Sequence, residues 1–128
     1  MSFTNFLETE ILDHVFAGSA YTAPATHYLA LYTAAPDETG GGTEVTTSGT
    51  AYARQSVSFT TTGNTTSNDA SVEYPTATAS FGTVTHVGVF DASTGGNLMA
   101  YAALSSSKTI DTGDVFRVPT GDLDITLD

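Results

Sequence analysis

Residues Thr83 to Leu104 read TVTHVGVFDASTGGNLMAYAAL, two apolar runs around a cluster of turn-forming residues. This pattern predicts a long β-hairpin, because apolar arms joined by a glycine-containing connection are typical of one. The candidate turn is formed by Asp91, Gly95, Gly96 and Asn97, and its glycines would supply the positive φ that the reversal needs. Both faces of the first arm carry apolar side chains. The hairpin is therefore expected at the centre of a sheet that is covered on two sides.

Alternation along the first arm predicts which side chains share a face of that sheet. One face would hold Val84, His86, Gly88 and Phe90, and the other would hold Thr85, Val87, Val89 and Asp91.

The length of 128 residues predicts one domain, 1–128, with enough chain to bury a core without crosslinks. Because there are no cysteines, disulfides and thiolate metal sites are excluded. No apolar run approaches the roughly 20 residues of a membrane span. The first residues include Glu8, Glu10 and Asp13 rather than the positive charge of a secretory signal. We therefore expect the protein to be made and assembled in a cytoplasm.

The composition is strongly acidic. Fourteen Asp and Glu residues face only Arg54, Lys108 and Arg117, which gives a formal net charge of -11. Binding to nucleic acid or to an anionic membrane depends on Lys and Arg, so neither is expected as a partner. The acidic residues are spread along the chain, which favours a role in solubility over a cation-binding block.

The only helical pattern lies near the N-terminus, where apolar residues recur at spacings of three and four. It predicts an amphipathic helix from Phe3 to Phe16, about 3–17 with its ends, followed by a β-domain over about 26–128. Ser2, Thr4 or Asn5 could cap the helix, and Asn5 with Glu8 has the spacing of a capping box. A short helix is marginal alone in water, so it must dock on its own sheet or on a neighbouring subunit. The suspected subunit-contact residues are Phe3, Phe6, Leu7, Ile11, Val15 and Phe16.

The remainder of the chain reads as short strands separated by turns. Residues 26–33 predict a strand with Leu29 and Leu31 on one face and Tyr28, Ala30 and Tyr32 on the other. Further strands are expected over 52–61, 70–74, 115–118 and 123–127, with a long polar loop over 34–50 and a turn over 63–69. This spacing predicts a mainly β fold, a compact antiparallel sandwich or partly open barrel with one helix.

No catalytic motif stands out. His14, His27 and His86 have no metal-like partner at helical or strand spacing, so no metal site or cofactor is expected. The aspartates of Asp111–Asp114 and Asp122–Asp124 lie at turns, where backbone hydrogen bonding explains them better than calcium does. There is no nucleophile motif, and little scaffold for a deep pocket. The protein is not expected to be an enzyme.

Four blocks together resemble a family of small bacteriophage virion proteins described as tail-fibre-like or minor structural proteins. The blocks are LYTAAPDETGGGTEV (31–45), YARQSV (52–57), VTHVGVFDASTGGNL (84–98) and SKTIDTGDVFRVPTGDLDITLD (107–128). The resemblance covers nearly the whole chain and implies a β-rich virion component with no catalytic residues. It assigns no role to Tyr52–Gln55, its most recognisable short block.

The resulting prediction is a non-enzymatic structural protein on the exterior of a phage particle, located in the virion. It would serve as a capsid decoration or as a minor tail or fibre-associated subunit. Its expected partners are other virion proteins and further copies of itself. The alternative is a tail module that binds host-surface carbohydrate, since tyrosine rings stack on sugars.

Overall fold

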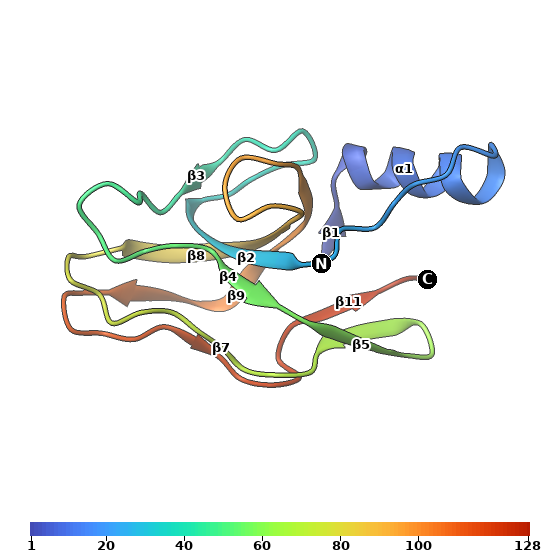
Figure 1. Ribbon diagram of the computed structural model, residues 1–128. Coiled ribbons are helices and arrows are strands. Elements are labelled where there is room, and N and C mark those ends of the chain that lie inside the picture. Colours follow the sequence, from blue (N-terminus) through green and yellow to red (C-terminus); the bar gives the residue numbers. More distant parts are fainter.

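The computed structural model describes residues 1–128, which form one α-helix and three antiparallel sheets (Figure 1). The helix is α1 (Asn5–Phe16). The strands are β1 (Ser2–Phe3), β2 (His27–Ala34), β3 (Thr43–Glu44), β4 (Gln55–Val57), β5 (Phe59–Thr62), β6 (Thr65–Asn68), β7 (Val72–Glu73), β8 (Gly82–Phe90), β9 (Leu98–Ile110), β10 (Arg117–Val118) and β11 (Asp124–Thr126). The fold is mainly β and sandwich-like, and its sheets do not close into a barrel.

The predicted central hairpin is confirmed. β8 and β9 pair antiparallel, and β8 lies inside the main sheet, whose order is β1-β9-β8-β2-β3 with β4 also paired to β2. Gly95 and Gly96 have φ of 59° and 71° in the turn between the two strands. The Asp91 carboxylate accepts hydrogen bonds from the backbone and side-chain nitrogens of Asn97, at 2.7 and 2.9 Å, which closes the turn.

The core lies between the main sheet and a second layer made of the β5-β6-β11 and β7-β10 sheets (Figure 1). Leu29 and Leu31 of β2 enter this core, as the alternation predicted. From the second layer, Tyr74 stacks on Tyr52 at 6.0 Å and meets Phe116 edge-on at 5.8 Å. The Tyr74 hydroxyl donates to the Leu29 carbonyl at 2.6 Å, which links the two layers inside the core.

The opposite face of the main sheet holds a smaller buried cluster of Ala30, Tyr32, Phe90 and Leu98. Gly88 makes this packing possible, because a Cβ there would lie 2.6 Å from Leu98 Cδ1 and 3.0 Å from Tyr32 Cε2. The sheet therefore buries apolar residues on both faces.

The predicted face of Val84 is wrong. Val84 belongs to the main core with Val87 and Val89, not to the face of Phe90. Val84 pairs with Lys108 and His86 pairs with Ala103, so residues 104–107 of β9 lie opposite Thr85 alone. This irregularity breaks the simple alternation and moves Val84 to the other face.

The helix begins later than predicted. Phe3 lies in β1, opposite Ala100 of β9, and is not helical. Thr4 is the N-cap, and its hydroxyl accepts from Leu7 N at 3.5 Å. Asn5 is already the first helical residue, so the proposed Asn5–Glu8 capping box is wrong.

Three other sequence-based boundaries also change. The 34–50 loop is not structureless, because β3 pairs with β2 and Asp37 bridges to Gly40. The expected 52–61 strand begins only at Gln55 and is interrupted at Ser58. The expected turn over 63–69 contains β6, whose Thr and Ser side chains hide its strand character in the sequence.

Candidate functional site

The helix α1 is attached to the main sheet only near its N-terminal end. Thr4 is 2 % exposed, its backbone nitrogen donates to Met99 O at 2.9 Å and its hydroxyl donates to Leu98 O at 2.6 Å. Leu7 is the only buried residue within the helix. Beyond that point the helix extends away from the sheets (Figure 1). Its C-terminal half therefore projects beyond the sheets.

The projecting half carries an exposed apolar surface, which we call the α1 stripe: Leu12, Val15 and Phe16. Their exposed fractions are 58 %, 59 % and 81 %. Leu12 and Phe16 are four residues apart and Val15 is three from Leu12, so all three share one face of the helix. Glu8, one turn before Leu12, is on the same side, and Asp13 borders the stripe. The stripe is thus an apolar surface edged by carboxylates.

The structure divides the suspected contact residues of the N-terminal segment. Val15 and Phe16 are exposed, whereas Leu7 is buried in its own chain. Phe3, Phe6 and Ile11 are partly buried, and Phe6 meets Tyr21 edge-on at 6.3 Å.

The segment after the helix is tied back to it. Ala17 is the C-cap and Gly18 has φ of 73°, which lets the chain reverse. The His14 Nδ1 atom accepts from Tyr21 N at 3.0 Å. His14 therefore holds the returning connector against the helix that bears the α1 stripe.

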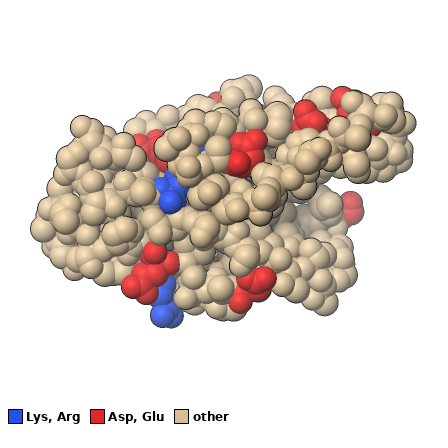
Figure 2. Space-filling model, in the orientation of Figure 1, with Lys and Arg blue, Asp and Glu red and all other residues tan.

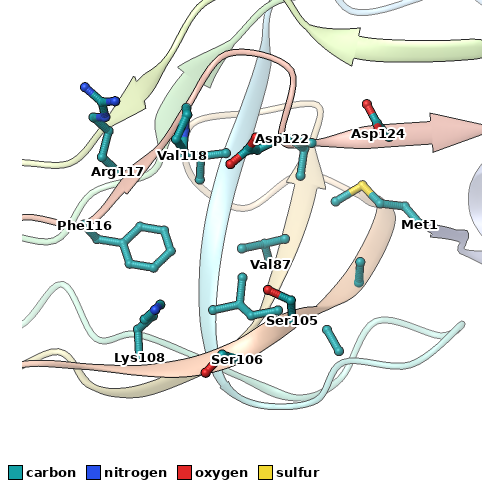
Figure 3. A pocket seen from close by; sticks show the side chains of 15 residues that line it. Met1, Val87, Ser105, Ser106, Lys108, Phe116, Arg117, Val118, Asp122 and Asp124 are labelled. Atoms are coloured by element: carbon teal, nitrogen blue, oxygen red, sulfur yellow. The ribbon is translucent and has the colours of Figure 1, made fainter.

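A second feature is a hollow of about 410 Å³ between β9 and the segment 116–124, which we call the β9 hollow. Its floor is made by the buried core residues Val87, Phe116, Val118 and Leu123, and its accessible apolar rim includes Met1, Leu104 and Pro119. Figure 3 shows the Phe116 ring and the Val87 side chain directed into it. These residues are far apart in sequence, so no local motif marks the site.

The charged groups of the β9 hollow are unevenly placed. Lys108 and Arg117 lie at one side of it, and Asp122 and Asp124 lie toward the other side (Figure 3). The chain has one ion pair, Arg54–Glu44, so Lys108 and Arg117 are the cations without a carboxylate partner. Glu73 is opposite Arg117 in the β7–β10 register but forms no ion pair with it. The Asp124 carboxylate accepts from the Ser67 hydroxyl, so it is already engaged within the chain.

Tyr52 and Arg54 of the Tyr52–Gln55 block belong to a polar cluster with Glu44. Arg54 donates through Nε and Nη2 to the two oxygens of Glu44, both at 2.9 Å. The Tyr52 hydroxyl donates to Glu44 Oε2 at 2.6 Å and accepts from Leu31 N at 3.1 Å. Burial, with the hydrogen bond to Glu44, raises the pKa of Tyr52 well above its ordinary value, so the hydroxyl stays a donor. The cluster joins the 34–50 segment to β2.

Arg54 also reaches the turn of the central hairpin. Its Nη1 donates to the carbonyls of Ala92 and Gly95 at 2.9 and 2.8 Å. Together with the bonds to Glu44, these contacts use four of the five N–H groups of the guanidinium. The cluster therefore stabilises the fold. Burial near Glu44 also raises the pKa of the neighbouring Tyr32 to about 12.

The histidines and turn aspartates singled out in the sequence lie on separate elements. No group of three or more His, Asp or Glu side chains is arranged to hold a metal ion. His14, His27 and His86 lie on α1, β2 and β8, and His27 packs edge-on against Phe59 at 6.0 Å. Asp114 accepts from Asp111 N at 2.9 Å, which is an ordinary turn contact. No helix of the chain has the length and apolar content to cross a bilayer.

A β-sandwich-like body with a projecting apolar helix is typical of a structural or binding subunit. The family model described as Podophage GP4 fiber I protein gp80 matches residues 2–126. The chain belongs to this family of phage fibre proteins, which confirms the resemblance seen in its sequence. No protein of curated function matches the chain.

Proposed function

We propose that the protein is a non-enzymatic structural subunit of a phage virion fibre, exposed on the outside of the particle. Its family is a fibre family, which favours this role over capsid decoration. The α1 stripe is the single observation that carries the proposal, because Phe16 is 81 % exposed at the end of a well-formed helix. A large apolar side chain in that position is typical of a surface that another protein covers.

The attachment would work through α1, with other virion proteins or further copies of the chain as partners. The sandwich-like body supplies rigidity, since its two layers are joined inside the core by the Tyr74 hydroxyl. A projecting contact helix and a rigid body are both suited to a structural subunit that is not an enzyme.

The test is localisation on intact particles of the phage that encodes the chain. Antibodies against the purified protein, applied to unfixed particles and viewed by electron microscopy, should label the fibres. Label confined to the capsid shell would contradict the fibre assignment, and absence of the chain from purified particles would contradict a virion role.

A second candidate is binding of host-surface carbohydrate, favoured by another hollow of about 440 Å³ beside the start of α1. Aromatic and polar side chains meet there, including Phe6, Tyr32, Glu38 and Asn97. A small-molecule site combines aromatic or apolar surface with a few placed polar groups, and this hollow offers both. Glycan-array binding that Glu38→Ala abolishes without loss of stability would support this second role. An array without signal would leave the structural role alone.

A further inference from the structure

We propose that the α1 stripe of one copy docks head-to-tail into the β9 hollow of the next copy. The inference rests on the proposed role of α1 as a subunit contact and names its partner surface. The stripe and the hollow are separate surfaces of one chain, because no residue of α1 lines the β9 hollow. The helix projects past the sheets (Figure 1), so it is available to a second molecule.

The apolar surfaces complement each other. The stripe presents Leu12, Val15 and Phe16 as a convex ridge. The accessible apolar rim of the hollow is made by Met1, Ala102, Ala103, Leu104 and Pro119, over a floor of the buried core residues Val87, Phe116, Val118 and Leu123. A hollow of about 410 Å³ is large enough for an aromatic ring and a branched side chain. Burial of large apolar side chains in such a hollow supplies the main stabilisation of a protein interface.

Charge decides between the possible occupants. α1 carries Glu8, Glu10 and Asp13 and has no Lys or Arg. Packing two α1 helices against each other would bring these like charges together, which opposes that pairing. Figure 2 shows the acidic atoms on α1, at the upper right, with no basic atoms beside them.

The β9 hollow offers the opposite sign at one side. Lys108 and Arg117 are the cations that form no ion pair within the chain, and both line the hollow. In the proposed orientation, α1 of the next copy places Glu8 and Asp13 beside Lys108 and Arg117. Asp122 and Asp124 at the other side would repel the reverse orientation. The hollow therefore selects α1 in one direction.

Such an interface is heterologous, because each copy contributes a different surface to it. Copies joined in this way form a ring where the rotation closes and an open filament where it does not. Either product would connect subunits along a fibre without any internal repeat in the chain.

The sharpest test is a charge exchange on the helix, read by analytical ultracentrifugation over a concentration series. Glu8→Lys with Asp13→Lys changes the formal net charge from -11 to -7, which reduces overall repulsion. Docking into the hollow predicts at least tenfold weaker self-association, because the new lysines meet Lys108 and Arg117. Adding Lys108→Glu and Arg117→Glu to the same chain should restore association. Stronger association of the helix variant alone would overturn the proposal in favour of α1–α1 pairing.

A mixing experiment supplies an independent readout. A stripe variant (Leu12→Ser, Phe16→Ser) and a hollow variant (Lys108→Glu, Arg117→Glu) should each be monomeric and should combine into a 1:1 dimer that does not grow. Leu127→Ser, which removes an exposed leucine outside both surfaces, is the control and should associate like the unmodified chain. Self-association of the hollow variant would overturn the proposal. A monomeric unmodified chain would also overturn it, whereas the proposed function would still stand if that monomer bound particles through α1.

Discussion

The guanidinium carbon of Arg54 lies 3.5 Å from the centre of the Phe90 ring. Stacked on this ring, the guanidinium donates hydrogen bonds to Glu44 and to the carbonyls of Ala92 and Gly95. One side chain therefore ties the 34–50 segment to the turn of the central hairpin. The planar fork and the stacking are properties of arginine that lysine does not share.

Replacing Arg54 with Lys should lower the free energy of unfolding by about 2 kcal/mol, because the ammonium cannot keep all four hydrogen bonds of the fork. Urea denaturation followed by circular dichroism measures the effect. Arg117→Lys, at an exposed position, is the matched control and should change stability by less than about 0.5 kcal/mol. Equal stability of the two variants would show that the Arg54 contacts do not hold the fold.

Tyr52→Phe should cost about 2 kcal/mol, since it leaves the buried Leu31 N–H without this acceptor and removes one of the two donors to Glu44 Oε2. The same denaturation measurement applies, with Tyr101→Phe at a partly exposed position as the control. A loss no greater than that of the control would mean that water replaces the Tyr52 hydroxyl without cost.

The sequence predicted the hairpin and the two faces of β2 because their signals are local. Alternation along residues 26–33 and the glycines after Asp91 act over a few residues. The face of Val84 could not be predicted, since it depends on how residues 104–107 pair with a distant strand. Strand β6 was missed because its Thr and Ser side chains resemble a turn.

Gly95 and Gly96 should respond differently to alanine, although both have positive φ. A Cβ at Gly95 meets nothing within 4 Å, so Gly95→Ala should cost only the backbone strain of about 1 kcal/mol. A Cβ at Gly96 would lie 2.7 Å from Ala92 Cβ and would press on the Asp91 carboxylate that closes the turn. Gly96→Ala should therefore be less stable than Gly95→Ala by at least about 1 kcal/mol in denaturant unfolding. The reverse order would show that the turn rearranges freely.

His27 should make the fold sensitive to mild acid. Burial lowers the pKa of His27 below its ordinary 6.5, although the charge of Asp91 opposes the shift. The unfolded chain then binds the proton more readily, so stability is full above pH 6.5 and falls as the pH decreases toward the folded pKa. The melting temperature of His27→Gln should depend less on pH between about 7 and 5 than that of the unmodified chain. Hydrogen bonds lower the pKa values of the Asp37 and Asp69 carboxylates, but both chains contain these groups, so the difference between the two chains reports on His27.

The candidate surfaces were less accessible to sequence reasoning than the fold. The helix and its apolar residues were predicted, but whether a face is covered depends on packing, and only the structure separates the buried Leu7 from the exposed Phe16. The β9 hollow combines β8, β9 and the 116–124 segment, so no sequence pattern could reveal it. The sequence did contain one indication that Arg54 is important, because it is one of only three Lys and Arg residues in a chain of net charge -11.

Incorporation into particles tests most directly whether the protein is a virion subunit attached through α1. The phage that encodes the chain would carry either the unmodified gene, the Leu12→Ser and Phe16→Ser variant, or the Leu127→Ser control, and mass spectrometry would count copies per purified particle. We expect normal copy numbers for the unmodified chain and the control, and at least a tenfold loss for the stripe variant even though it folds. Full incorporation of the stripe variant, or absence of the unmodified chain from particles, would contradict the account.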